Sequence, residues 1–232
     1  MVSANVVLVV SSGGWWVPLL ADMTSADTAS PSMSSDSDVC ESQEDCFQAA
    51  ALPKERLGKA LNKEQILLLK LERLQRLMER FPATLLAKRA GLLSGVLLLE
   101  RDPATAIHFL RAAQRDFPVL DDYIRLWTGE ALLNLGDTKQ AADMFESIPQ
   151  VVPDSSLLTK AAYRAGEAWY QSSSCPEATA WFAKAVELDD KEPGIHQALL
   201  RRGVCLLRDN NIPDSRKTLM HIWVRFPYSA EA

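Results

Sequence analysis

The chain has 232 residues, 47% of them hydrophobic, and a formal net charge of −5. Residues 1–53 contain seven acids and neither lysine nor arginine, so the other residues sum to +2. A nearly neutral body gives no reason to expect nucleic acid as a partner, since nucleic acid favours a basic face. No apolar run approaches the roughly 20 residues of a membrane-spanning helix, so we expect no transmembrane span.

The first 21 residues contain two apolar runs, 6–10 and 15–21. They are typical of the apolar part of an export signal, although the positively charged start of such a signal is missing. We interpret residues 1–21 as a possible degenerate export signal, with a simple disordered tail as the alternative. The first interpretation predicts a periplasmic or cell-envelope protein of a bacterium, and the second leaves the cytoplasm open.

Residues 22–53 are rich in serine, aspartate, threonine and alanine. Such a segment has too little apolar surface to offset the entropy of ordering, so we predict an acidic, serine-rich disordered linker. A helix is then expected from Lys63 to Arg80, because a broad leucine stripe runs along it. This helix should cap a helical domain over residues 54–232.

Four small residues recur along that domain at spacings of 35, 37 and 37: Ser94, Gly129, Gly166 and Gly203. Large apolar residues follow each of them by sixteen positions, and a proline follows three of them by twenty-four. This is the tetratricopeptide frame, in which each repeat is a pair of helices that cross closely at the small residue. The repeats are expected at 84–118, 119–153, 155–191 and 193–227. The sequence therefore predicts an all-α fold, a tetratricopeptide-like α-solenoid with about four helix pairs in a right-handed superhelix, preceded by a disordered N-terminal tail.

The cysteines and histidines give no metal site. The spacing of Cys40 and Cys46 would permit a local disulfide in an oxidising compartment, but it matches no standard zinc pattern. We expect all four cysteines, Cys175 and Cys205 included, to be unpaired or incidental. The three histidines lie on separate predicted helices. Glycine loops that hold phosphates or dinucleotides are also missing, so no metal, cofactor or catalytic residue is predicted.

Repeats of this kind usually bind peptides on the inner, concave surface. In the frame used here, that surface presents the following candidate binding residues: Tyr123, Glu130, Asn134, Lys160, Tyr163, Glu167, Tyr170 and Arg208. Glu130 and Glu167 are interpreted as solvated lining of the groove, not as paired catalytic acids. Four tryptophans are interpreted as packing between helices and not as a sugar platform: Trp127, Trp169, Trp181 and Trp223.

The region 68–228 resembles a known bacterial family. The resemblance rests on Glu-Arg-Asp-Pro at 100–103, the Phe-Pro and Asp-Asp-Tyr junction within 115–123, the segment 129–137 and Arg-Phe-Pro-Tyr-Ser at 225–229. It is similar to the N-terminal helical superstructure of soluble lytic murein transglycosylases. The resemblance implies a noncatalytic helical region that accompanies a downstream lysozyme-like domain, which cleaves peptidoglycan by a Glu-Ser motif. Neither Glu-Ser pair of this chain, at 41–42 and 146–147, lies in the setting expected for that motif.

Two functions follow. The chain is either the helical part of a cell-wall lytic enzyme, with the lysozyme-like domain, peptidoglycan or envelope proteins as partners, or a stand-alone scaffold that holds a protein segment in its concave groove. At the other end of the solenoid, we predict that Leu219, Ile222 and Trp223 form an apolar face. A further helix pair is expected to cover this face, either later in the natural chain or from a partner.

Overall fold

A computed structural model describes residues 6–10, 16–20, 42–51, 62–189, 191 and 194–231. The chain divides into two compact units, residues 1–39 and residues 40–232, which are considered separately. In the first unit, β1 (Val6–Val10) pairs with β2 (Trp16–Leu20) as an antiparallel ladder in which Val6 lies opposite Leu20. The two apolar runs of the expected export signal thus form strands here. Export remains a prediction, and residues 22–41 of the expected linker lie outside the described residues.

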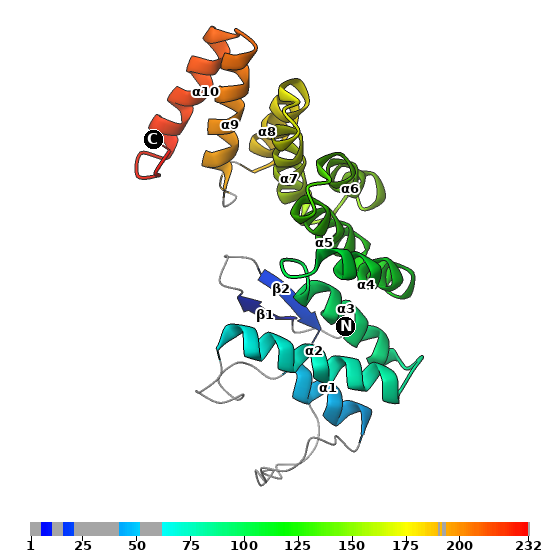
Figure 1. The fold of residues 1–232 in the computed structure, drawn as a ribbon. Coiled ribbons are helices and arrows are strands. Elements are labelled where there is room, and N and C mark those ends of the chain that lie inside the picture. The colour runs from blue at the N-terminus through cyan, green and yellow to red at the C-terminus, as the bar shows by residue number, and fades with distance from the viewer. Residues whose placement is uncertain are drawn as a thin grey trace. The chain divides into compact units, whose positions relative to one another are not determined.

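The described residues of the second unit form α-helices and one short 3-10 turn, η2 (Pro118–Leu120) (Figure 1). The helices in chain order are α1 (Gln43–Ala51), α2 (Lys63–Arg80), α3 (Leu85–Leu97), α4 (Pro103–Asp116), α5 (Asp121–Asn134), α6 (Thr138–Val151), α7 (Leu158–Gln171), α8 (Cys175–Leu188), α9 (Ile195–Arg208) and α10 (Ile212–Arg225). The helix predicted from Lys63 to Arg80 has those bounds in the structure. The four expected repeats correspond to the pairs α3–α4, α5–α6, α7–α8 and α9–α10. The predicted all-α solenoid is therefore confirmed.

The predicted linker is wrong over residues 43–51, which form α1. Ser42 and Asp45 hydrogen-bond each other at the start of this helix, and the Ser42 hydroxyl oxygen accepts from the Asp45 backbone at 3.2 Å. Cys46 and Ala50 are 1% and 0% exposed and belong to one apolar cluster with Leu74 of α2. The average composition of residues 22–53 favoured disorder. A helix forms over 43–51 nevertheless, because its first turn is capped and one of its sides is buried against the apolar face of α2.

The turns inside the last three helix pairs repeat one backbone conformation. Gly136, Ser173 and Asn210, spaced 37 apart, all have a positive φ, of 82°, 64° and 59°. The residue after each of them donates its backbone N–H to a carbonyl five residues earlier, at 2.8–2.9 Å. This is the left-handed conformation that commonly ends a helix. The second helix of each pair can then begin at once.

Several second helices begin at side-chain caps. The Asp102 and Asp137 side chains accept hydrogen bonds from backbone N–H groups three residues later, as the Asp-Pro and Asp-Thr pairs predict. The pKa of the Asp102 carboxyl is lowered because the side chain and backbone of Thr105 hydrogen-bond to it. α8 begins differently, since Ser174 precedes it without a side-chain cap.

The glycines of the repeat frame lie where the two helices of a pair cross, and each faces a large apolar side chain of the second helix. A Cβ placed on Gly129 would lie 2.5 Å from Cε1 of Phe145, and one placed on Gly166 would lie 2.6 Å from Cδ1 of Phe182. Phe145 and Phe182 are fully buried. The glycines therefore make room for the rings that fill the crossings.

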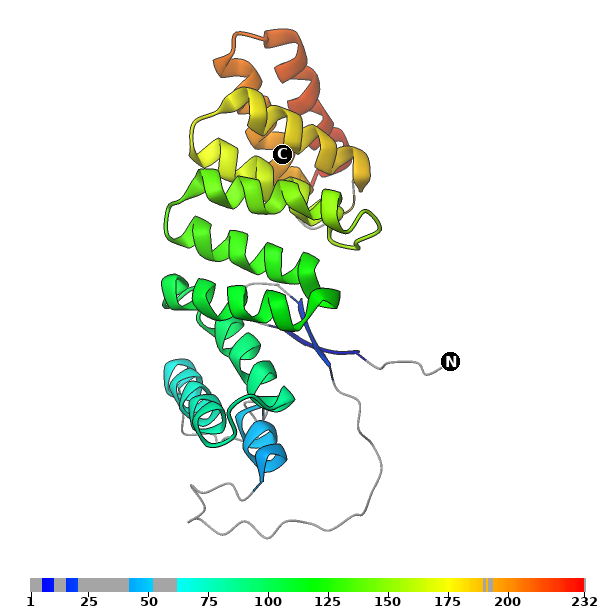
Figure 2. The same cartoon turned by 90° about the vertical axis from the view of Figure 1, so that its right-hand side faces the viewer.

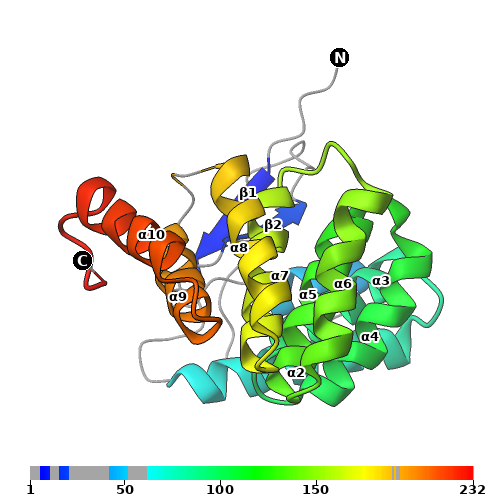
Figure 3. The same cartoon turned by 90° about the horizontal axis from the view of Figure 1, so that it is seen from above.

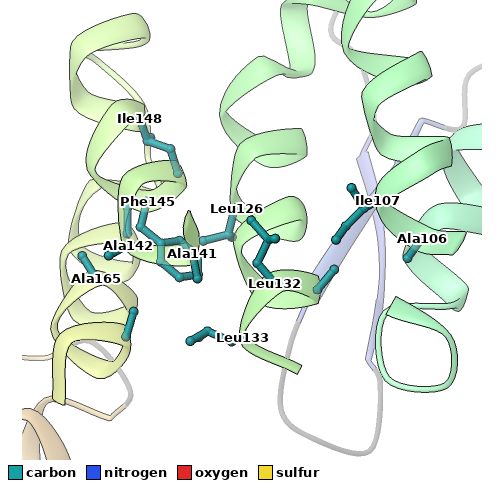
Figure 4. Packing of buried hydrophobic residues seen from close by; sticks show 13 residues of the cluster. Ala106, Ile107, Leu126, Leu132, Leu133, Ala141, Ala142, Phe145, Ile148 and Ala165 are labelled. Carbon is teal, nitrogen blue, oxygen red and sulfur yellow. The ribbon is translucent and has the colours of Figure 1, made fainter. Parts of the chain in front are cut away.

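The core continues from each pair into the next. Every helix from α1 to α9 packs on the helix that follows it, and the pairs stack in succession (Figure 2). Seen along the stack, consecutive pairs from α3 to α8 overlap one another (Figure 3). Leu126 and Leu132 of α5 lie between Ile107 of α4 and Phe145 of α6 (Figure 4). Neighbouring pairs therefore cover each other's apolar surfaces.

The last pair leaves an apolar surface exposed, as predicted for Leu219 and Trp223, but the prediction is wrong for Ile222. Six of the twelve exposed large apolar residues in the described part of the chain lie between positions 207 and 228. An open groove runs between the end of α9 and the outer side of α10, and its lining consists of Leu207, Ile212, Ser215, Arg216, Leu219, Met220 and Trp223. Trp223 is 66% exposed, whereas Ile222 is buried and packs inside the pair. We call this surface the α10 groove.

The α10 groove should make the chain self-associate, because an apolar patch of this kind favours contact with another apolar surface. Sedimentation velocity over a wide concentration range should show reversible oligomers. The substitution Trp223→Lys should shift the chain toward monomer. A matched change at Val119, which is 91% exposed but isolated between α4 and α5, should leave the oligomers unchanged. A wild-type chain that is monomeric at every concentration would contradict the prediction.

Candidate protein-interaction surface

The first helices of the pairs share one side of the stack. α7 contacts α9 directly although α8 separates them in sequence, and side chains also connect α5 to α7. We call the surface of α5, α7 and α9 the first-helix face. Three side-chain pairs, each 34 residues apart, link one first helix to the next: Glu130–Arg164, Tyr163–Gln197 and Glu167–Arg201. Because the repeat length is 37, each pair joins a residue to a position one helical turn earlier in the following repeat.

Glu130 and Arg164 form a bidentate ion pair between α5 and α7. Arg164 donates from Nε to Oε1 of Glu130 at 2.6 Å and from a second nitrogen to the other carboxylate oxygen. The two side chains are only 19% and 16% exposed. A bidentate pair fixes the orientation of both groups. The interpretation of Glu130 as solvated lining is therefore wrong.

Glu167 is more deeply buried, and the solvated interpretation is wrong for it as well. The residue is 3% exposed, and its Oε2 atom pairs with the guanidinium of Arg201 on α9. Its other oxygen, Oε1, is buried without a hydrogen-bond partner among the described residues. A buried carboxylate requires a compensating cation, which explains why Arg201 lies beside it.

Tyr163 joins the same two helices. It is 8% exposed, and its hydroxyl donates to Oε1 of Gln197 at 3.1 Å. Burial raises the pKa of the Tyr163 phenol above its usual value. The shift favours the neutral phenol, which is the form that donates to Gln197.

The remaining predicted residues differ in accessibility. Asn134 is exposed and donates to the Leu99 carbonyl at 2.8 Å, and Tyr123 is half-buried with its ring 5.7 Å from that of Trp127. Lys160 is half-buried at the start of α7. Tyr170 and Arg208 lie together at the carboxyl ends of α7 and α9, with the Arg208 guanidinium 5.4 Å from the ring centre. Their binding role stays a prediction.

Arg164 and Arg201 were missed as members of this surface. The sequence nevertheless carries a signal for them, since an arginine follows each of the two glutamates by 34 residues. A coincidence at one repeat would mean little, but its recurrence marks a contact between successive first helices. These arginines also neutralise the negative charge of Glu130 and Glu167 on this face.

Most tryptophans pack between helices, as expected. Trp127 is 9% exposed, and Trp169 donates from its indole nitrogen to Oε1 of Glu146 at 2.5 Å. Trp181 is partly buried, and the ammonium of Lys184 lies 4.5 Å from its ring. Trp223 is the exception, because it lies in the exposed α10 groove.

The expectation of unpaired or incidental cysteines is wrong for Cys175 and Cys205, which form a disulfide with Cα atoms 5.1 Å apart. Cys175 begins α8 and Cys205 lies in α9, so the bond joins the third pair to the fourth. The repeat offset again brings together residues that sequence spacing separates by 30. Cys46 is also disulfide-bonded, so the expectation is wrong for it as well, and Cys40 lies outside the described residues.

The described part of the chain contains no group of three or more histidine, cysteine or acidic residues that could hold a metal ion. None of the helices there combines the length and apolarity needed to cross a bilayer.

A family model for the tetratricopeptide repeat matches residues 123–155, which cover α5 and α6. The pairs α7–α8 and α9–α10 repeat the helix lengths, glycine crossing and left-handed turn of α5–α6. The described helical unit therefore has a tetratricopeptide-like α-solenoid fold. No curated protein sequence matches the chain at a significant level.

Several solved structures share this fold and align with most of the chain. YrrB, described as a tetratricopeptide repeat protein with an unusual peptide-binding site, is 17% identical, with a TM-score of 0.60 over 82% of this chain and 90% of its own. PilW, a type IV pilus biogenesis factor, is 16% identical, with a TM-score of 0.61 over 82% and 80%. A tetratricopeptide repeat protein from Parabacteroides merdae is 16% identical, with a TM-score of 0.63 over 81% and 68%. At these identities the likeness concerns the fold.

Proposed function

We propose that this chain is an interaction scaffold that holds a segment of a partner protein along its first-helix face. The observation that carries the proposal is the ladder of pairs between α5, α7 and α9, which makes that face continuous and orders its side chains before any partner arrives. Preorganised side chains lose less entropy on binding. The aromatic and charged groups that remain accessible, Tyr170 and Arg208 among them, are of the kinds enriched at binding sites.

The scaffold is proposed to work outside the reducing cytoplasm, in the periplasm or cell envelope. The disulfide between Cys175 and Cys205 supports this location, because such bonds persist in oxidising compartments and are rare in the cytosol. The apolar runs near the N-terminus are consistent with export. The peptide-binding site of YrrB, a protein of the same fold, agrees with a binding role.

Site-specific photo-crosslinking would test the proposal. Peptides selected from a random twelve-residue display library on the full chain would serve as probes. A benzophenone amino acid placed at Tyr123 or at the exposed Gln171 of α7 should crosslink to them. The same group at Leu188, which is 44% exposed on α8, should not. Equal crosslinking at Leu188, or none at the first-helix positions, would overturn the proposal.

The second candidate is the helical part of a lytic murein transglycosylase. The Phe-Pro and Asp-Tyr repeat junctions favour it, whereas the solved structures compared above give it no support. Purified peptidoglycan sacculi, pelleted with the full chain, should retain the chain if this candidate is right. Failure to co-pellet would remove it.

Even then, the chain alone should not release anhydromuropeptides. Glu146, which belongs to one of the two Glu-Ser pairs, lies half-buried in α6 and accepts the hydrogen bond of Trp169. It is therefore engaged in packing two helices and has no setting for acid catalysis. Chromatography of digested cell wall should show no turnover, and turnover that disappears in Glu146→Gln would contradict this prediction.

A further inference from the structure

Two guanidinium groups of α9 lie over one tyrosine ring of α7. The Cζ atoms of Arg201 and Arg208 are 5.5 Å and 5.4 Å from the ring centre of Tyr170. The two arginines are seven residues apart, which is two turns of the same helix, so their side chains point to the same side of α9. Tyr170 and Arg201 are half-buried, and Arg208 is exposed.

The two arginines differ in their charge balance. Arg201 is neutralised by Glu167, whereas none of the described carboxylates forms an ion pair with Arg208. α9 carries three arginines and no acid, while α5 carries three acids and one arginine. Positive charge therefore accumulates at the α9 end of the first-helix face, although the chain as a whole is acidic.

Stacking leaves the hydrogen-bonding edge of a guanidinium free. An arginine on an aromatic ring uses its flat face for that contact, and the N–H groups at its edge keep the geometry that matches a carboxylate. The ring also restricts the arginine side chain before binding, which lowers the entropy cost. Arg208 is thus positioned to bind a carboxylate from solution.

We propose that the partner of the first-helix face is an acidic peptide segment, with an aspartate or glutamate carboxylate bound to Arg208 above Tyr170. This inference rests on the proposed function and specifies its partner: the acidic part of the segment lies on α9, and its less charged part runs toward α5.

The library selection described above also tests the partner class. Peptides selected on the wild-type chain should be enriched in aspartate and glutamate relative to the library. That enrichment should disappear on Arg208→Gln and on Tyr170→Leu. It should persist on Tyr170→Phe, which keeps the ring, and on Lys217→Gln, which removes one positive charge from the exposed side of α10.

Fluorescence anisotropy then measures the effect. The probe is one selected acidic peptide, labelled with fluorescein, and its matched control has every acid replaced by the corresponding amide. The acidic peptide should bind the wild type more tightly, and Arg208→Gln should weaken it by roughly tenfold or more, the usual loss for a hydrogen bond to a charged group. Lys217→Gln should change its affinity less than twofold, which is about 0.4 kcal/mol or less.

Each result separates the two proposals. Equal losses in Arg208→Gln and Lys217→Gln would mean general charge attraction and would overturn the inference. Selected peptides that crosslink at Gln171 without acidic enrichment would overturn the inference and leave the scaffold function standing. A lack of crosslinking at the first-helix positions would overturn both.

Discussion

Removing the disulfide between Cys175 and Cys205 should lower the free energy of unfolding by about 3–4 kcal/mol, the loop-entropy value for a bond that closes 30 residues. The bond restrains the unfolded chain and joins α8 to α9 in the folded one. Without it, the last helix pair should also separate from the third pair more readily, because terminal repeats contact a neighbour on one side only.

The measurement is urea denaturation of Cys175→Ala/Cys205→Ala beside its parent, with and without reductant. Both proteins should carry alanine at positions 40 and 46, so that reductant acts on no other disulfide. Reductant should lower the midpoint of the parent to that of the double variant and leave the double variant unchanged. A parent that is insensitive to reductant would show that this bond contributes nothing to stability.

Replacing Gly129 with leucine should cost on the order of 1–3 kcal/mol of stability through overpacking. A Cβ at this position would lie 2.5 Å from the Phe145 ring, closer than van der Waals contact allows. Phe145 is fully buried in the core that joins α4, α5 and α6, so it has no space into which to move. Gly129→Ala should already destabilise for the same reason.

Gly91 provides the matched control. It also lies inside a first helix, α3, but a Cβ there would meet its nearest neighbours at 3.7 Å, which is ordinary contact. Gly91→Ala should leave stability unchanged or raise it by up to about 1 kcal/mol, because alanine has the higher helix propensity. Chemical denaturation of both alanine variants would compare them, and an unchanged midpoint for Gly129→Ala and Gly129→Leu would contradict the crossing geometry.

The repeat frame predicted which residues belong to the first-helix face, but it did not predict their exposure. The frame identified Tyr163, Glu167 and Tyr170 as residues of one surface because it fixes which side of each first helix faces the next. It could not tell which of them would be accessible. Tyr163 and Glu167 are buried by their partners Gln197 and Arg201, whereas Arg208 keeps an exposed guanidinium. Accessibility depends on how far each first helix is shifted along its neighbour.

The sequence by itself determined the helix pairs, their turns and their crossings. These features depend on local chemistry that recurs with the repeat: caps at Asp102 and Asp137, a left-handed residue at Gly136, and glycines opposite large apolar side chains. Each of these features can be recognised within one repeat, and its recurrence in the next repeats confirms where each repeat begins.

Only the tertiary structure decided which residues of different repeats meet. The one-turn offset between α7 and α9 pairs Glu167 with Arg201, and the packing of α8 on α9 brings Cys175 to Cys205. The packing of α1 on α2 was likewise decided by the tertiary structure, because the composition of the predicted linker favoured disorder there. These contacts depend on the angle and shift between neighbouring helices, which the summed packing of many side chains sets and no single segment encodes.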